Sequence, residues 1–363
     1  MIRIDRRLLQ NVDWLLVATA FAVVGLGLWT LWSLAPKGSN GGMSARQLSW
    51  IGIGLLGLLV VAGVDYRRLI QTAPALYLGG LALLAAVMVA GRPVAGAQRW
   101  ISLGPVSLQP SELFKLIFIV TLVWALTARW AHPLSPGAVL FSFGLLILPF
   151  TLVARQPDLG SALVLVPVHL AILVGAGVRS RLLGWLGGVV VASAPLAWLV
   201  LKEYQRERLL VYLDPLRDPL GSAYNVIQSR IAIGSGQLLG KGIDGATQSR
   251  LAFLPERHTD FIFAVFAEQW GFIGCLVLLA CYAALVLRGF EIAATAREPA
   301  GRLVAVGVTA LLAAQILINV GMVTGLLPIV GIPLPLMSYG GSSMVVSLMA
   351  LGLLLSVRMR QFR

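Results

Sequence analysis

The segment LPERHTDFIFAVFAEQWG, residues 254–271, places several ionisable side chains where an apolar run begins: Glu256, Arg257, His258, Asp260 and Glu268. Ionised groups at the mouth of a membrane helix are costly unless they are solvated, paired or used in chemistry. A carboxylate in this position could act as a general base. It could also cap the helix, because Thr259 and Asp260 precede the apolar FIFAVFA and either side chain could accept a bond from an unpaired backbone N–H.

A second polar stretch, GAQRWISLGPVSLQPSELFK, joins two apolar runs, and Pro110-Ser111 marks the start of a helix. We expect Arg99 and Trp100 to lie in the loop before it. Glu112 and Lys115 are three residues apart on the expected helix, close enough to pair. A structural ion pair that neutralises both charges within the bundle is favoured over a direct role in chemistry.

The motif RQPDLGSA, residues 155–162, opens another apolar run. Asp158 follows Pro157 in the first turn, where a carboxylate suits the unsatisfied backbone N–H groups. A helix cap or a re-entrant turn is therefore favoured over catalysis.

Two further segments break the apolar pattern. GSGQLLGKGIDG carries five glycines between residues 234 and 245, so we expect turns there. Such a loop could present N–H groups to a phosphate, but a flexible linker is favoured because the spacing matches neither nucleotide-binding glycine pattern. NVGMVTGLLPIVGIPLPLMSYGGSS is rich in proline and glycine, and irregular backbone at membrane depth needs protein or a water-filled cavity to satisfy it. We expect a cavity that opens outward.

The whole chain has the composition of a membrane protein. Of its 363 residues 58% are hydrophobic and only 12% are charged, which excludes an ordinary soluble domain. We predict an all-α polytopic membrane protein, a single integral membrane domain over residues 1–363 with about ten transmembrane helices. The expected spans are 13–35, 48–64, 73–91, 112–128, 138–154, 161–177, 182–201, 260–287, 303–325 and 342–357.

The long connection 202–259, between spans seven and eight, is the one sizeable element predicted outside the membrane. Within it, SAYNVIQSRIAIG has the apolar spacing of an interfacial amphipathic helix. Cys275 and Cys281 lie six apart in one apolar run and do not share a helix face, so we expect buried small hydrophobes and no disulfide or metal site.

Arginine placement predicts the orientation. With a cytoplasmic N-terminus, the inner segments hold Arg3, Arg6, Arg7, Arg67, Arg68, Arg129, Arg179, Arg181, Arg288, Arg297, Arg302, Arg358, Arg360 and Arg363. The short outer loops then hold only Lys37, Arg46, Arg92, Arg99 and Arg155. This asymmetry favours both termini inside, with the loop 202–259 outside.

The formal charge of +13 does not indicate nucleic-acid binding, because the basic residues are spread through loops without a basic block. Anionic lipid head groups or a phosphate-bearing substrate fit this distribution better. The residues leave two classes open: an enzyme that acts on a lipid-linked polar substrate, or a transporter. When the connection 202–259 is included, most of the charge sits at the outer face, which favours the enzyme.

Five motifs together resemble the SEDS family, the shape, elongation, division and sporulation proteins: LPERHTDFIFAVFAEQWGFIG, NVGMVTGLLPIVGIPLPLMSYGGSS, QPSELFK, QPDLGSA and AIGSGQLLGKG. Their order and the ten expected spans cover nearly the whole chain. The short N-terminus, Arg257 before HTDFIFA, and GIPLPLMSYGG resemble the rod-shape branch more than the division branch. Gln269 departs from the family, which often has a second acid after Glu268, so a mechanism built on that neighbouring pair is not favoured.

The resemblance implies a peptidoglycan glycosyltransferase that polymerises lipid II during cell-wall elongation and rod-shape maintenance, in the bacterial inner membrane. The family's essential aspartate maps to Asp260, the implied general base. Basic side chains would hold the pyrophosphate of the leaving group. The candidates near the outer face are Arg99, Lys115, Arg155, Lys241, Arg250 and Arg257. Arg99 and Arg257 are preferred because guanidinium forks fit phosphate oxygens. His258 could relay a proton, although a hydrogen-bonded loop histidine is favoured.

The same resemblance implies a class B penicillin-binding protein as partner. Its transmembrane helix would need a close-packing face, for which we consider the small residues Ala293, Ala294, Gly307, Ala313 and Ala314. Glu112, Lys115, Asp158 and Glu268 are expected to support the site. A divalent cation could assist phosphate departure, but no dense carboxylate cluster demands one. The alternative function is a lipid II flippase.

Overall fold

The computed structural model describes residues 11–34, 42–94, 97–103, 106–128, 135–179, 203–214, 223–250 and 253–361, and single residues between them at 181, 182, 184, 188, 192 and 218. These residues form two compact units. Unit 1 comprises the described residues within Met1–Gly177, Ala280–Gln315 and Pro335–Arg363, and unit 2 comprises those within Val178–Leu279 and Ile316–Leu334. The predicted span 182–201 falls almost wholly outside the described residues.

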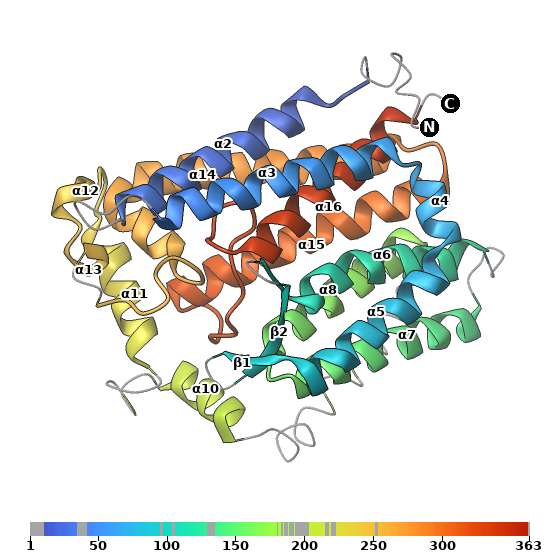
Figure 1. The fold of residues 1–363 in the computed structure, drawn as a ribbon, viewed down its shortest axis with the longest axis horizontal. Helices are drawn as coiled ribbons and strands as arrows, with labels where there is room; N and C mark the ends of the chain where they lie inside the picture. The colour runs from blue at the N-terminus through green and yellow to red at the C-terminus, as the bar shows by residue number, and fades with distance from the viewer. Residues whose placement is uncertain are drawn as a thin grey trace. The chain divides into compact units, whose positions relative to one another are not determined.

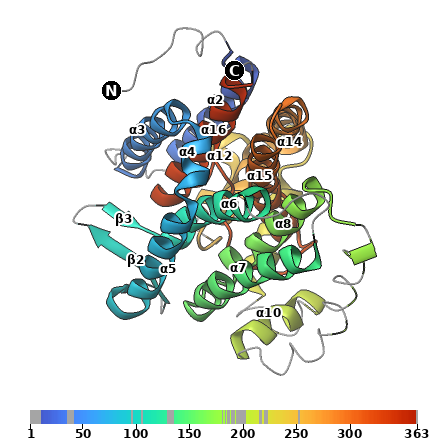
Figure 2. The same cartoon turned by 90° about the vertical axis from the view of Figure 1, so that its right-hand side faces the viewer.

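Unit 1 is built mainly from long apolar helices, with the short helix α4 between two of them (Figures 1 and 2). They are α2 (Trp14–Ser33), α3 (Gly42–Gly63), α4 (Tyr66–Gln71), α5 (Ala73–Ala90), α6 (Pro110–Ala128), α7 (Pro136–Arg155), α8 (Leu159–Gly175) and α16 (Gly341–Met359). Two further helices, α14 (Ile262–Thr295) and α15 (Pro299–Thr324), run through both units. Unit 2 adds α10 (Glu203–Leu213), α11 (Tyr224–Ser235), α12 (Gly242–Gly245) and α13 (Thr247–Arg250).

Within the described residues, eight helices are long and apolar enough to cross a membrane: α2, α3, α5, α6, α7, α14, α15 and α16. Helix α8, expected as a span over 161–177, is apolar but has only 17 residues and contains Pro167. The chain is thus a helical, multi-pass membrane protein, as the composition predicts. Helix α10 lies in the connection 202–259, where the sequence analysis identifies only the amphipathic helix in SAYNVIQSRIAIG.

Helices α6 and α16 form the buried interior of unit 1, while α3 and α5 keep exposed apolar side chains such as Leu56 and Leu78 that suit lipid. Figure 1 shows α3 and α16 side by side. They approach closely at Gly352, where an added Cβ would lie 2.6 Å from the Leu58 carbonyl oxygen. Any side chain at residue 352 would therefore push the two helices apart.

The small-residue face considered for a partner helix is largely internal to unit 1. A Cβ added at Gly307 would lie 2.8 Å from side-chain atoms of both Ile119 in α6 and Ile172 in α8. Ala293 and Ala314 are also buried. The placement of a partner helix is therefore wrong for Ala293, Gly307 and Ala314, because small side chains here allow close packing of the chain's own helices. Ala294 is exposed, and for this residue the placement stays a prediction.

A small antiparallel sheet replaces part of the expected loop before α6. Its strands are β1 (Arg92–Val94), β2 (Ala97–Leu103) and β3 (Val106–Leu108), in the order β1-β2-β3. Arg92 pairs with Trp100, and Ile101 pairs with Leu108. Arg99 and Trp100 thus lie in a strand, and the loop prediction for them is wrong. Strand β2 packs against α5 and α6.

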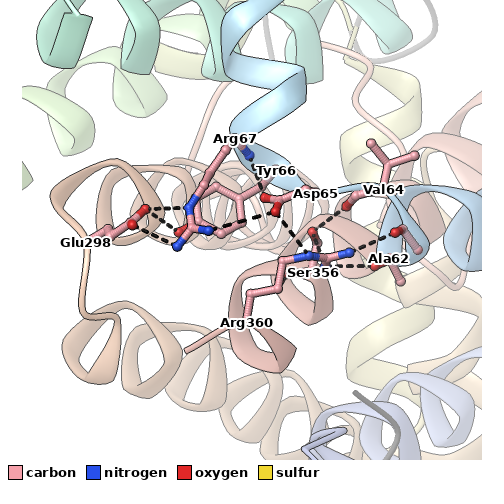
Figure 3. A network of polar contacts seen from close by, with 9 residues as sticks. Ala62, Val64, Asp65, Tyr66, Arg67, Glu298, Ser356 and Arg360 are labelled. Carbon is pink, nitrogen blue, oxygen red and sulfur yellow. Dashed lines mark hydrogen bonds and ion pairs between the residues drawn. The ribbon is translucent and has the colours of Figure 1, made fainter. Parts of the chain in front are cut away.

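A polar network joins three connections of unit 1 (Figure 3). Arg67 donates through Nε and Nη2 to the Glu298 carboxylate at 2.9 and 2.7 Å, and the Tyr66 hydroxyl donates to the same group at 2.9 Å. Buried Arg360 donates to the carbonyl oxygens of Ala62, Gly63 and Ser356. The turn after α3, the start of α15 and the end of α16 are therefore fastened together.

Helix α14 is interrupted inside the part that belongs to unit 2. Gly271 has φ 65° and ψ −163°, a conformation open essentially to glycine alone. The N–H groups of Phe272 and Ile273 donate to the carbonyl oxygens of Gln237 and Leu238 at 2.8 and 3.1 Å. The glycine-rich segment thus supplies the acceptors that the interrupted helix lacks.

We expect Gly271→Ala to destabilise the protein by about 1–3 kcal/mol from backbone strain alone. Steric overlap adds to this, because the new Cβ would lie 2.3 Å from the Gly240 nitrogen. The matched control is Gly25→Ala in α2, where the added Cβ meets open space and helix propensity improves by up to about 1 kcal/mol. Thermal unfolding in detergent measures both, and equal melting temperatures for the two variants would contradict the strain.

Candidate active site

Asp260 lies in a turn directly before α14, in unit 2. Phe261 precedes the first helical residue, and its carbonyl accepts a bond from the Val265 N–H at 3.3 Å. Asp260 therefore precedes the residue in the N-cap position. Its side chain is half-exposed.

Asn319 of α15 holds the backbone of this turn. Its side-chain Nδ2 donates to the Asp260 carbonyl oxygen at 2.9 Å and to the Ile332 carbonyl oxygen at 2.6 Å. The amide thereby links Asp260 to the irregular segment that follows α15. Asn319 is fully buried, and its Oδ1 has no hydrogen-bond partner in the structure.

Gly331 lies against the Asp260 carboxylate. A Cβ added to this glycine, which has φ +70°, would lie 3.2 Å from Oδ2 of Asp260. The proline- and glycine-rich segment expected to form an outward cavity therefore borders the candidate base.

Glu268, fully buried in α14, binds the short helix α13. Its carboxylate accepts bonds from the N–H groups of Gln248 and Ser249, both at 2.9 Å, and from the Ser249 hydroxyl. Arg257 donates through Nη1 to the Ser249 carbonyl oxygen. Burial lowers the pKa of the Arg257 guanidinium, which nevertheless stays a cation at neutral pH. Glu268 and Arg257 thus both hold α13 in place, and Glu268 has a structural role in the site.

The glycine-rich segment packs tightly against α14, which excludes a flexible linker. The Lys241 N–H donates to the Glu268 carbonyl oxygen at 2.9 Å, and the Gly240 N–H donates to the Gly236 carbonyl oxygen at 2.8 Å. These two N–H groups are therefore not available to cradle a phosphate. The expectation of turns alone is also wrong at its end, where residues 242–245 form α12. The Lys241 side chain is exposed.

His258 is half-buried in the turn that contains Asp260. Desolvation lowers its pKa from the usual 6.5, Glu256 opposes this shift, and Arg257 adds to it. The imidazole is therefore neutral at neutral pH.

A depressed histidine pKa means that the unfolded chain binds the proton more readily. The stability contributed by neutral His258 is present above about pH 6.5 and is lost as pH falls towards the folded pKa. We expect the fall in thermal stability between about pH 7.5 and about pH 5.5 to be smaller in His258→Gln than in the wild type. An equal or larger fall in the variant would contradict this assignment.

A second polar cluster lies in unit 1 and centres on Asp158. This residue is the N-cap of α8, and its Oδ1 accepts a bond from the Ser161 N–H at 3.3 Å. Its Oδ2 accepts bonds from Gln109 Nε2 at 2.8 Å and the Ser111 hydroxyl at 2.9 Å. The cap interpretation is confirmed, and QPSE and QPDLGS form one hydrogen-bonded cluster.

Arg99 reaches this cluster from β2. Its guanidinium donates to the Gln156 carbonyl oxygen at 3.2 Å and to the Pro157 carbonyl oxygen, and lies 3.9 Å from Asp158 Oδ1. Arg155, at the end of α7, is exposed. The structure therefore places Arg99 against backbone oxygens and Arg155 towards the surroundings.

Glu112 and Lys115 form the ion pair that their spacing predicts. The Lys115 ammonium lies 2.6 Å from the Glu112 carboxylate, and the two side chains are 2% and 4% exposed. Each charge is thus neutralised inside unit 1.

Sequence reasoning missed Asn319 and Gly331 as site residues, although both lie against Asp260. An asparagine in an apolar span was the available signal, because polar side chains at membrane depth usually serve a function. Among the described residues no group of three or more His, Cys, Asp or Glu side chains could hold a metal ion.

These features define a class: a helical membrane protein with a half-exposed aspartate at the mouth of a span and a fixed, irregular segment beside it. The model of the FtsW/RodA/SpoVE family, described as "Cell cycle protein", matches residues 10–362. The chain belongs to this family.

Its relatives include the peptidoglycan glycosyltransferase MrdB of Escherichia coli K12, 42% identical over 96% of this chain and 93% of MrdB. A chain from a solved peptidoglycan synthase complex that coordinates polymerization and crosslinking is 36% identical. The similarity covers 97% of this chain and 99% of that one, with a TM-score of 0.84. Thermus thermophilus RodA, solved as an aspartate-to-alanine mutant, is 32% identical, with coverage of 97% and 99% and a TM-score of 0.73.

Proposed function

We propose that this chain is a peptidoglycan glycosyltransferase that polymerises lipid II during cell-wall elongation, with Asp260 as general base. The 4-hydroxyl of one disaccharide attacks the anomeric carbon of another. The bond to undecaprenyl pyrophosphate breaks, and Asp260 takes the hydroxyl proton. The observation that carries the proposal is the position of Asp260: half-exposed at the mouth of α14, with its backbone fixed by Asn319.

Asn319 is a positioning residue in this scheme, because it fixes the backbone on which the carboxylate stands. Its Oδ1, which has no hydrogen-bond partner in the structure, is costly to bury unsatisfied and suits a water or a substrate hydroxyl.

Arg257 and Lys241 are the proposed cations for the departing pyrophosphate. Arg257 uses Nη1 on the Ser249 carbonyl, and the rest of its guanidinium fork suits phosphate oxygens. Arg155 is exposed and remains in the proposed set. Arg99 contacts the backbone of the Asp158 cap, so we assign it first to positioning of that motif.

The proposed location is the bacterial inner membrane, with both termini cytoplasmic. The network in Figure 3 supports the assignment of these connections to one side of the membrane. Arg67, Glu298 and Arg360 belong to segments that the arginine distribution places inside, and one network joins them. Asp13, before α2, also pairs with Arg288 near the end of α14 at 2.6 Å. Cysteine labelling of intact cells at Leu239, which is exposed in the glycine-rich segment 234–245, but not at the termini is the expected result.

A class B penicillin-binding protein is the proposed partner, bound through membrane spans and the outer surface. The solved relative from a peptidoglycan synthase complex supports assembly with another protein.

The decisive experiment is polymerisation of purified lipid II by this protein in liposomes, alone and with its partner, beside a flipping assay with fluorescent lipid II. Glycan product without flipping is expected. Flipping without glycan, both with and without the partner, would place the chain among transporters.

A further inference from the structure

Helices α10 and α11 and the segment after α15 enclose a pocket in unit 2 that the proposed reaction does not use. The empty space between its walls, open solvent included, is about 410 Å³. It is lined by Arg208, Val211, Tyr212, Val226, Arg230, Gly325, Leu327, Pro328 and Ile329. We call it the α10–α11 pocket, and none of its residues belongs to the proposed catalytic or pyrophosphate-binding set.

The pocket is built by specific contacts between its walls. The Tyr212 hydroxyl donates to the Leu326 carbonyl oxygen at 3.0 Å, which holds α10 against the segment after α15. The Ser229 hydroxyl donates to the Val323 carbonyl oxygen at 2.9 Å and holds α11 against the end of α15. The walls therefore form part of the fold of unit 2.

Arg230 crosses one wall at Gly325. This glycine has φ +82°, and a Cβ added to it would lie 3.2 Å from Cδ of Arg230. Because Gly325 has no side chain, the aliphatic part of Arg230 can pass over it. In the described structure the Arg230 guanidinium makes no hydrogen bond or ion pair, although a second arginine, Arg208, lines the same pocket.

A purely structural role for Arg230 would be to neutralise the C-terminal end of α15. That end already has other donors. The Val320 carbonyl oxygen accepts a bond from the Thr324 hydroxyl, and the Gly321 carbonyl oxygen accepts bonds from the Leu326 and Leu327 N–H groups. The Met322 carbonyl oxygen accepts a bond from the Gly325 N–H, and the Val323 carbonyl oxygen accepts one from the Ser229 hydroxyl. The guanidinium of Arg230 is therefore not needed at this helix end and is available to an anion from outside the chain.

The position of the pocket indicates the source of that anion. Helix α15 has 26 residues, so it is about 39 Å long, which exceeds the hydrocarbon core of about 30 Å and reaches the level of the head groups. The pocket begins at the residue directly after this helix. Exposed Leu213 and Leu326 beside it suit contact with acyl chains.

We propose that the α10–α11 pocket binds the phosphate head group of an anionic phospholipid, with Arg208 and Arg230 on the phosphate. Two guanidinium groups match phosphate oxygens, and the apolar walls from Val211, Val226 and Ile329 match the first carbons of the lipid. The site is independent of lipid II polymerisation.

The test uses the full-length protein and native mass spectrometry of lipid adducts, with phosphatidylglycerol as the probe. Arg230→Gln and Arg208→Gln are each expected to weaken phosphatidylglycerol binding about tenfold or more. Arg206→Gln is the matched control, because it removes an arginine from the same helix but not from the pocket lining. Arg230 is exposed, so its replacement by Gln or Lys is expected to leave the melting temperature unchanged, and Arg230→Lys should retain part of the binding.

Three further arms identify the ligand. Phosphatidylcholine should bind weakly and with no difference between variants. Inorganic pyrophosphate should not displace phosphatidylglycerol. Equal loss of phosphatidylglycerol binding in Arg206→Gln would overturn the assignment of the lipid to this pocket. If farnesyl pyrophosphate binds in an arginine-dependent way and phosphatidylglycerol does not, the pocket belongs to a prenyl-linked reactant instead.

Discussion

Replacing Asp260 by Asn is expected to lower the rate of glycan formation from lipid II by about 10²–10⁴-fold while the protein folds, inserts and keeps its partner. An amide has nearly the shape of the carboxylate but does not accept the proton. If Asp260 served only as a helix cap, Asn would replace it with little loss, because it caps equally well. Single-turnover polymerisation of lipid II measures the difference.

Glu256→Gln is the matched control for this change. Glu256 belongs to the same turn, is exposed, and accepts a bond from the Thr259 hydroxyl at 3.0 Å. We expect its replacement to preserve the rate. Near wild-type polymerisation by Asp260→Asn would make the carboxylate structural, and Glu256 and Asp158 would be the next bases to test.

Breaking the Glu112–Lys115 pair is expected to destabilise the protein by about 3–5 kcal/mol, because the remaining charge would be buried without a partner. The double replacement of Glu112→Leu with Lys115→Met should recover most of this loss, since no charge is then left behind. Thermal unfolding in detergent of the two single variants and the double variant forms a complete cycle. If both single variants are fully stable but inactive, Glu112 and Lys115 belong to the active site and the pair is not only structural.

The sequence predicts helices and local pairs well because their signals are local. Apolar length predicts the spans, the three-residue spacing predicts the contact of Glu112 with Lys115, and the first-turn position predicts the cap at Asp158. The strands around Trp100 were missed because β1 and β3 have only three residues each, and glycines and prolines interrupt the segment, so it carries too little pattern to be distinguished from a loop.

The contacts of the candidate site could not be predicted, because they join residues far apart in the chain. Nothing near Asp260 in the sequence indicates that Asn319, 59 residues later, binds its carbonyl oxygen. Gly271 reads as an ordinary helix glycine, and its unusual backbone becomes understandable only when the Gln237 carbonyl is placed beside the next N–H. The position of Arg230 likewise depends on Gly325, which follows α15 and lies against the arginine side chain.

The interruption at Gly271 also determines how motion of the loop could be observed. In a continuous apolar helix, the amides of Phe272 and Ile273 would exchange with deuterium only when the helix itself opened. Here they are protected by the carbonyl oxygens of Gln237 and Leu238. The hydrogen-exchange rate of these two amides therefore measures how often the glycine-rich segment 234–245 separates from α14.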